Sequence, residues 1–426
     1  MADGQRNNNK KALFISSYAP PAIGGPQNLY TLLRDFPQES YAILTSFYNI
    51  DNFSAKSGSW LKGGYFFYDN LSATKEERQK SGGEASQKTN ILQKIKMAVK
   101  RIGWLKAVLG TPIIFSQIFM ILKAGPRIAK KIGADVIIEV SDYGPAMIGG
   151  YLTHRITKKP LILFMFDLYK GNYLPFPGGL LAYIFEPKIF KSASKIIVTN
   201  GGTKDFYIKR YGEKIADKIV VIHNSVFPEG YKNNTSVITE HKPPYSLLFT
   251  GRIYWPQIGS IKNIIRAVNE LDDVVFNIYC PNPKDYLKQI GIEEGLKVKI
   301  SAAPPSEMPK IQGAADILLL PLSWNTKSPQ IIDTATPGKL TDYLIAGKPI
   351  LIHAPASTYL IKYAKENNFA AVADTEDTEK LKETIGKLAK NTDWANELVK
   401  NARETFHRNH DANKNAMIFR EVINSV

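Results

Sequence analysis

The sequence predicts an α/β protein with parallel β-sheets, divided into two domains. Three near-continuous apolar runs, residues 134–140, 161–166 and 195–199, have the character of strands that helices cover on both faces. A polar, proline-bearing link at 227–244 is followed, from residue 245, by a fresh series of strands and helices. With 426 residues and a hydrophobic content of 44%, the chain is long enough for two domains of ordinary size.

The apolar runs of the first half alternate with helical segments, as a parallel sheet with crossover helices requires. An amphipathic helix is expected near residues 28–36, between the first two strands. The polar stretch 49–89, rich in Gly, Ser and Lys, is expected to be mobile. The predicted strands of this half are 11–16, 41–45, 134–140, 161–166, 195–199 and 218–223.

The second half repeats this alternation after the link. The predicted strands are 245–250, 274–279, 298–301, 315–320 and 349–353. Helices are predicted near 261–271, 357–366 and 379–391, and a last helical segment is expected at about 413–426.

The segment that begins at Pro337 combines a helix start with a buried strand, and it is the strongest candidate for a ligand site. Thr336 suits the N-cap, Pro337 suits the first helical position, and Gly338 lets a ligand approach the backbone closely. Four unpaired N–H groups and the helix dipole attract anions there, and Lys339 adds a full charge. Asp342, one turn further, is placed to accept hydrogen bonds from ribose hydroxyls. A diphosphate site is one interpretation, and an ordinary capped helix is the other.

Two further groups of residues follow predicted strands of the first half. Gly24 and Gly25 lie in a loop between a strand and a helix, where they either present backbone N–H groups to a phosphate or form a plain tight turn. Asp167 comes directly after the strand 161–166, and ligands of parallel sheets bind beyond the carboxyl ends of the strands. Its carboxylate is therefore a candidate acceptor-side group, with helix capping as the alternative.

The positive charge of the chain is concentrated in its first half. Residues 1–242 contain 33 Lys and Arg against 18 Asp and Glu, whereas residues 243–426 contain 22 against 21. The first half is therefore expected to have an anionic partner, and both nucleic acid and an anionic membrane surface fit the charge. The sequence contains no recognised nucleic-acid-binding motif, so we expect a membrane surface and no nucleic acid.

The segment 88–131 is both basic and apolar. It contains ten Lys and Arg and no Asp or Glu, and apolar residues recur in it at helical spacing. Its longest uncharged run, 107–122, contains Gly110 and Pro112 and is shorter than the roughly 20 residues that a spanning helix needs. The pattern is typical of a helix that docks on a membrane surface, above all over 94–106. An apolar helix pair in the core with a solvated basic face is the alternative.

The remaining composition indicates a cytoplasmic protein. Cys280 is the only cysteine, which excludes a disulfide framework, and the polar N-terminal residues contain no apolar segment of the signal-peptide kind. The sequence has no P-loop motif, no HExxH motif, no Cys and His cluster and no Asp-x-Asp pair. We therefore expect no metal, so that Arg, Lys and helix dipoles would neutralise a diphosphate.

Three motifs together resemble the glycosyltransferase family 4 enzymes of GT-B fold. They are PPAIGG, KIVVIHNSV, and AADILLLPL followed by PGKLTDYLIAGKPIL. Their order and spacing match the family over nearly the whole chain. The resemblance implies two Rossmann-like domains that face each other across a cleft, with the C-terminal helix crossing back to the first domain. The implied first domain covers residues 1–240 and a helix at about 405–426, and the implied donor-binding domain covers 241–404.

The resemblance also assigns donor contacts to residues of these motifs. The glycines of PPAIGG would contact the donor phosphate and sugar, and the arginine after the strand 245–250 would hold the diphosphate. The glycine and lysine of PGK match the phosphate-contacting segment, and the aspartate of KLTDY stands where the family has a ribose-binding glutamate. In this sequence the residues are Gly24, Gly25, Arg252, Gly338, Lys339 and Asp342.

Several positions depart from the family pattern. Thr334 stands where the family has a sugar-contacting glutamate, and the adjacent Asp333 is the candidate substitute. Gln257 stands where the family has a lysine, with Lys262 further along the next helix as a third cation for the diphosphate. The acceptor-domain histidine of the family has no counterpart, which leaves Asp167 as the nearest polar group.

The implied activity is retaining, metal-independent transfer of a hexose from a UDP- or GDP-sugar to a lipid-linked or polysaccharide acceptor. Arg252 and Lys339 would assist departure of the nucleoside diphosphate, and Asp167 would act on the acceptor side. The nucleotide sugar is a substrate, and no cofactor is expected. The basic first half adds the expectation of a peripheral protein on the inner face of the cell membrane. The alternatives are a nucleotide-sugar epimerase and a catalytically inactive nucleotide-binding partner of a membrane glycosylation complex.

Overall fold

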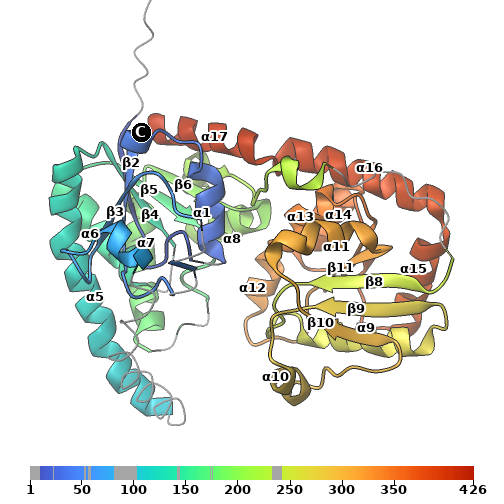
Figure 1. Ribbon diagram of the computed structural model, residues 1–426. Helices are drawn as coiled ribbons and strands as arrows, with labels where there is room; N and C mark the ends of the chain where they lie inside the picture. Colours follow the sequence, from blue (N-terminus) through green and yellow to red (C-terminus); the bar gives the residue numbers. More distant parts are fainter. Residues whose placement is uncertain are drawn as a thin grey trace, which may run out of the picture. The chain divides into compact units, whose positions relative to one another are not determined.

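The protein consists of two compact units, each built on its own sheet (Figure 1). The computed structural model describes residues 10–22, 24–51, 54–55, 59–80, 103–141, 144–172, 174, 176–232 and 242–426, and for 103–110 it describes the backbone alone. The first unit comprises the chain up to Ile222 together with the residues from Asn413 onward. The second unit is His223–Ala412.

The first unit contains a seven-stranded parallel sheet with the order β3-β2-β1-β4-β5-β6-β7. Strands that are covered on both faces are apolar throughout, and β1, β2, β4 and β5 are accordingly buried at every position. The strands are β1 (Ala12–Ile15), β2 (Tyr41–Thr45), β3 (Gly64–Phe67), β4 (Val136–Val140), β5 (Leu161–Met165), β6 (Lys195–Val198) and β7 (Ile219–Val221).

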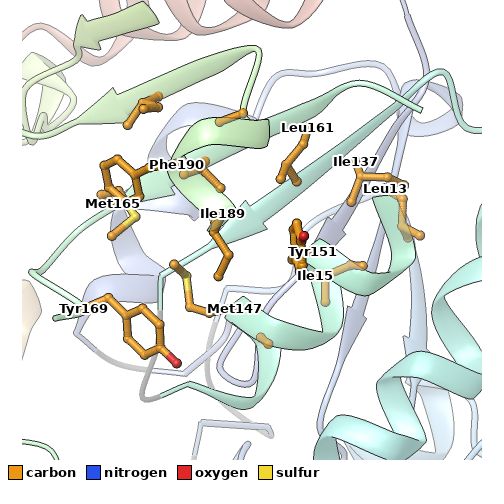
Figure 2. Close-up of a cluster of buried hydrophobic side chains, with 14 of the residues drawn as sticks. Leu13, Ile15, Ile137, Met147, Tyr151, Leu161, Met165, Tyr169, Ile189 and Phe190 are labelled. Atoms are coloured by element: carbon orange, nitrogen blue, oxygen red, sulfur yellow. The ribbon is translucent and has the colours of Figure 1, made fainter. Parts of the chain in front are cut away.

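Helices α5, α6 and α7 cover one face of the first sheet. Leu13 and Ile15 of β1 point to this face, where they lie in one buried cluster with Met147 and Ile189 of the helices (Figure 2). The helices of the first unit are α1 (Gly25–Leu33), α3 (Lys75–Lys80), α5 (Gly103–Ile132), α6 (Pro145–Thr157), α7 (Gly178–Ser192), α8 (Gly201–Tyr211) and α17 (Ala412–Asn424).

Helices α1 and α17 cover the opposite face of this sheet. Phe419 of α17 is fully buried, and its ring centroid lies 6.1 Å from those of Phe14 and Phe36 and 5.5 Å from that of Phe164. Burial of a phenylalanine side chain contributes about 2–3 kcal/mol to stability. The last helix therefore completes the core of the first unit, although the preceding helix, α16 (Thr392–Asn409), belongs to the second.

The second unit contains a six-stranded parallel sheet with the order β10-β9-β8-β11-β12-β13. Leu247 and Phe249 of β8 pack with α9 and α15 on one face, and Leu248 packs with α13, α14 and α16 on the other. The strands are β8 (Tyr245–Thr250), β9 (Val274–Tyr279), β10 (Val298–Ser301), β11 (Ile317–Pro321), β12 (Ile350–His353) and β13 (Ala371–Ala373). The remaining helices are α9 (Ile258–Glu270), α10 (Lys284–Gln289), α11 (Met308–Ala314), α12 (Pro329–Thr334), α13 (Lys339–Ile345), α14 (Tyr359–Asn367) and α15 (Thr378–Lys390).

The structure differs from the sequence prediction in several places. The stretch 49–89, expected to be mobile, contains β3 and α3, because Tyr65 and Phe67 bury their rings on the edge of the sheet. β13 was not predicted, since three residues carry too little periodicity. Helix α1 begins at Gly25, three residues before the predicted start. Within the described residues, no helix combines the length and apolar character that a bilayer span requires.

Candidate functional site

The end of β8 in the second unit carries Gly251, which stands against the side chain of Lys339. Gly251 has a φ of +104°, a conformation that side-chain-bearing residues rarely adopt. A Cβ atom here would lie 2.5 Å from Cε of Lys339, so only glycine leaves room for the lysine stem. The Lys339 ammonium lies 4.8 Å from the ring centroid of Phe249. The side chain of Lys339 therefore passes over the backbone at Gly251, directly after the end of β8.

The ammonium of Lys339 has no carboxylate partner within 4.0 Å among the described residues. The side chain is partly buried, and burial lowers its pKa to about 8, while the charge of Asp342 acts in the opposite direction. A buried cation without a partner is unfavourable, and an anion that binds to it relieves this cost. The end of β8 is therefore suited to a phosphate group.

Asp342 lies within α13 and accepts a hydrogen bond from Tyr231. The hydroxyl of Tyr231 donates to Oδ1 of Asp342 at 2.6 Å and lies 3.2 Å from Oε1 of Gln312. Nε2 of Gln312 donates to Oγ1 of Thr250 at 3.3 Å, and the backbone N–H of Thr250 donates to the hydroxyl of Tyr343 at 3.0 Å. Because the single hydroxyl proton of Tyr231 goes to Asp342, its contact with Oε1 of Gln312 is not a second hydrogen bond. Tyr231 thus holds the carboxylate, and Tyr343 joins α13 to the last residue of β8.

The protonation state of Asp342 depends on this surrounding. Burial raises the pKa of Asp342 to about 6, while the hydrogen bond from Tyr231 and the charge of Lys339 lower it. At neutral pH the carboxylate is therefore mostly ionised. Because an ionised carboxylate has about four lone-pair sites and Tyr231 uses one, it can accept further hydrogen bonds from hydroxyl groups of a ligand.

The start of α13 differs from the predicted one. The helix covers Lys339–Ile345 and has Gly338 as its N-cap, so Thr336 is not the N-cap and Pro337 is not the first helical residue. The backbone N–H of Leu340 already donates to the carbonyl of Pro337 at 2.9 Å, so four unpaired N–H groups are not present here. The reason is a tight turn that precedes the helix. The anion site therefore depends on the lysine charge more than on the helix start.

The cations considered for a diphosphate are not equally placed. Arg252 is exposed and directly follows Gly251, which Lys339 contacts. Lys262 is exposed at the start of α9, and its ammonium would lie 3.1 Å from a Cβ atom at Gly291. Arg252 thus follows the residue at the end of β8 that Lys339 contacts, whereas Lys262 lies beside another loop.

Gln257, which replaces the lysine of the family pattern, has a structural contact. It is buried, and its Oε1 accepts a hydrogen bond from the backbone N–H of Tyr254 at 3.2 Å. Asn282 fixes the same loop, because its side chain donates to the carbonyl of Ile253 and accepts from the N–H of that residue. The loop after β8 is therefore held from inside, and Arg252 is presented on its surface.

Asp333 and Thr334, the candidates for the sugar contact, both lie at the end of α12. Oδ1 of Asp333 accepts a hydrogen bond from Oγ of Ser357 at 2.7 Å. The hydroxyl of Thr334 donates to the carbonyl of Gln330 at 2.8 Å within its own helix. Asp333 is the more accessible of the two, since Thr334 is buried. A sugar contact of either residue remains a prediction.

In the first unit, the start of α1 and the residue that precedes Asp167 meet at the carboxyl end of the sheet. Gly24 has a φ of +97° and is the N-cap of α1. A Cβ atom at Gly25 would lie 3.3 Å from the ring of Phe166, the residue before Asp167. The backbone N–H of Phe166 donates to Oγ of Ser141 at 2.8 Å, which fixes the end of β5. Asp167 itself is exposed, so its side chain is available to a ligand.

A buried ion pair fixes the loop that follows Asp167. Nη1 of Arg210 lies 2.9 Å from Oε1 of Glu186, and the hydroxyl of Tyr211 donates to the same oxygen at 2.6 Å. The other oxygen of Glu186 accepts from the backbone N–H of Lys170, and Arg210 donates to the carbonyl of Lys170. Both backbone groups of this loop residue are therefore held by the ion pair.

Sequence reasoning missed Tyr231, which supports Asp342. Tyr231 falls in the segment 227–244 that was interpreted as a link, and no local pattern marks it as a partner of α13. The membrane-docking segment 94–106 lies outside the described residues up to position 102, and only the backbone of its remainder is described.

No protein-family model and no curated protein matches the sequence. Among solved structures, Anabaena Alr3699/HepE in complex with UDP-glucose is 13% identical, with a TM-score of 0.63 over 98% of this chain and 100% of that chain. The apo form of the lipopolysaccharide outer core galactosyltransferase WaaB is 14% identical, with a TM-score of 0.60 over 97% of this chain and 99% of that chain. A UDP-N-acetylglucosamine 2-epimerase is 15% identical, with a TM-score of 0.52 over 98% and 97% of the two chains.

These similarities concern the fold, since sequence identity is low in every case. They extend over both units of the chain, and each unit has the parallel sheet with covering helices that Rossmann-like domains share. The protein therefore has the two-domain, Rossmann-like α/β fold of the GT-B glycosyltransferases.

Proposed function

We propose that this protein is a retaining, metal-independent glycosyltransferase that moves a hexose from a nucleotide diphosphate sugar to a lipid-linked or polysaccharide acceptor at the cytoplasmic membrane face. The observation that carries the proposal is the unpaired ammonium of Lys339 against Gly251, with the fixed carboxylate of Asp342 one turn further. A cation and a carboxylate at this spacing suit a nucleotide, which offers phosphates and ribose hydroxyls. UDP is the first nucleotide to test, because similar structures contain it.

In the proposed reaction, an acceptor hydroxyl oxygen forms a bond to the anomeric carbon while the bond from that carbon to the diphosphate oxygen breaks, and the hydroxyl proton passes to the departing diphosphate. Negative charge develops on the departing diphosphate. Lys339 and Arg252 stabilise this charge, as fixed cations stabilise a developing anion in other transferases. Asp342 binds the ribose, Gly338 allows close approach of the phosphates, and Asp333 with Thr334 faces the sugar.

The first unit supplies the acceptor side in this proposal. Gly24 and Gly25 leave a loop without side chains that a ligand can approach, and the exposed Asp167 orients the acceptor hydroxyl. Attack from the same face as the departing diphosphate keeps the anomeric configuration. The excess of Lys and Arg in residues 1–242 supports a position of the enzyme against an anionic membrane.

The test is a panel of UDP-, GDP- and ADP-sugars, with release of the nucleoside diphosphate as the first readout and calorimetric binding of UDP as the second. We expect binding and turnover with one nucleotide, undiminished by EDTA. Lys339→Ala and Asp342→Ala should each reduce affinity by about 10–100-fold, the range expected for a lost charge-assisted contact. NMR of the product reports whether the anomeric configuration is kept. Absence of nucleotide binding would refute the proposal.

The same experiment separates the alternatives. The similarity to a UDP-N-acetylglucosamine 2-epimerase supports an epimerase as the second candidate. An epimerase converts the nucleotide sugar without an acceptor and produces an isomeric sugar, which NMR detects. An inactive binding partner binds UDP with the same dependence on Lys339 and turns over no sugar with any acceptor.

A further inference from the structure

Helix α5 carries a stripe of exposed side chains that changes from apolar to basic along its length. Phe115 and Phe119 are 51% and 64% exposed, and the exposed Lys123 and Arg127 continue the stripe at the same four-residue spacing. Exposure of two phenylalanine rings side by side on one helix is uncommon for a surface that faces only water. The stripe therefore indicates a contact surface.

Helix α7 repeats this arrangement. Leu180 and Ile184 are 51% and 40% exposed, and the exposed Lys188 follows at the same spacing. Tyr183, beside them on the helix, is 65% exposed, and the ammonium of Lys170 lies 4.4 Å from its ring centroid. Within their described side chains, these two helices of the first unit thus present exposed apolar residues first and basic residues further along.

The apolar parts of the two helices lie close to each other. Ile118 of α5, Ile148 of α6 and Leu181 of α7 form one buried cluster, and Ile114 and Phe185 pack against it. Helices that connect parallel strands run opposite to the strands, so the N-terminal parts of α5 and α7 lie at the carboxyl edge of the sheet. The exposed rings are therefore at the edge that carries Asp167.

Exposed negative charge is absent from this surface within its described residues. From residue 111 to the end of α5, and through α6 and α7, Glu186 is the sole carboxylate. Glu186 is buried and paired with Arg210, so it contributes no negative surface charge. The exposed charges of these described helical residues are Lys123, Arg127, Lys130, Lys131, Arg155, Lys188 and Lys191.

We propose that the apolar and basic faces of α5 and α7 dock on an anionic lipid bilayer. Phe115, Phe119, Leu180 and Ile184 would enter the boundary between headgroups and acyl chains, and the lysines and arginines would contact lipid phosphates. A protein partner would need a matching acidic surface with apolar pockets, and a second copy of this surface would bring like charges together. A bilayer with acidic headgroups supplies both chemistries at once.

This inference rests on the proposed function and specifies the class of acceptor. Because the docking surface is at the carboxyl edge of the first sheet, a lipid-linked acceptor would reach Asp167 from the bilayer on which the enzyme lies. A soluble acceptor would need no such surface. The structure thus favours the lipid-linked class of acceptor over a free glycan.

The test is flotation of the full-length protein with vesicles of phosphatidylcholine alone and of phosphatidylcholine mixed with phosphatidylglycerol. We expect binding to the mixed vesicles, reduced by added salt. The variant Lys123→Glu with Arg127→Glu should lower partition by at least about tenfold, since each basic residue near an anionic surface contributes about fivefold. Phe115→Ser with Phe119→Ser should lower it by about tenfold through lost apolar insertion.

Matched controls come from the second unit. Leu296, which is 100% exposed, is replaced by Ser, and the exposed Lys299 and Lys310 are both replaced by Glu. These variants should float like the unmodified protein. Absence of flotation of the unmodified protein, or unchanged flotation of the α5 variants, would overturn the proposal, as would a dimer in light scattering that the phenylalanine variant dissociates. UDP binding is measured on the same samples, so that failure of docking is distinguished from failure of the transferase proposal.

Discussion

The hydroxyl of Tyr231 donates a 2.6 Å hydrogen bond to Oδ1 of Asp342, across 111 positions of the sequence. Tyr231 ends a short 3-10 helix, Pro228–Tyr231, close to where the chain enters the second unit. The bond lowers the pKa of Asp342 against the effect of burial, which raises it. Tyr231, together with the charge of Lys339, therefore favours the ionised form of this carboxylate.

UDP binding should weaken at low pH, and replacing Tyr231 by Phe should move this loss of affinity to higher pH. The pKa of Asp342 is about 6 in the intact protein, so affinity should weaken as the pH falls through that value and the carboxylate gains a proton. Loss of the hydrogen bond raises this pKa further, because it removes a contact that favours the charged form. Calorimetry between about pH 5 and pH 8 measures the shift. Tyr286→Phe on α10 serves as the control and should leave the profile unchanged.

UDP binding should also weaken at high pH, and replacing Lys339 by Met should remove this pH dependence. Burial lowers the pKa of Lys339 to about 8, so the free protein loses this positive charge as the pH rises through that value. We expect UDP affinity of the intact protein to fall above about pH 8, and the variant to bind about 10–100-fold more weakly with no such fall. If UDP affinity falls above about pH 8 equally in both proteins, another group causes this loss of affinity.

Replacing Gly251 by Ala should impair stability and nucleotide binding together. The substitution forces a side chain into a φ of +104° and places Cβ 2.5 Å from Cε of Lys339. We expect a loss of about 1–3 kcal/mol in the free energy of unfolding, measured by urea denaturation, and weaker UDP binding because the lysine is displaced. Gly295→Ala, at a position with open space around it, is the matched control.

Replacing Arg210 by Met should destabilise the first unit. The substitution leaves the carboxylate of Glu186 buried without its cation, which costs about 3–5 kcal/mol in comparable cases. Adding Glu186→Gln should recover part of this loss, because the charge is then gone. Since the pair lies in the first unit, UDP binding at Lys339 should stay unchanged below the unfolding transition, and a parallel loss of binding would contradict this assignment.

The sheet strands were predictable from sequence because parallel strands covered on both faces are continuous apolar runs. This holds for β1, β4, β5 and β11, which are buried at every position. The edge strand β3 was missed, since only Tyr65 and Phe67 in its four residues are buried and the surrounding stretch is polar. Local composition therefore predicts fully buried strands well and edge strands poorly.

The site could be predicted only in part, because contacts between distant segments have no local pattern in the sequence. Lys339 was singled out by local chemistry, but its contact with Gly251 depends on the packing of β8 against α13 and has no local signal. The N-cap at Thr336 was wrong, because a tight turn delays the helix to Lys339. Tyr231 could not be found at all, since its partner lies far along the chain.

The burial of Phe419 among aromatic residues of the first unit has a consequence for biosynthesis. A ribosome makes residues 1–222 first, then the whole second unit, and only afterwards the helix that contains Phe419. The nascent first unit therefore leaves the apolar surface that α17 later covers exposed throughout translation of the second unit. Chaperones that bind apolar segments would find their target at this surface until α17 emerges from the ribosome.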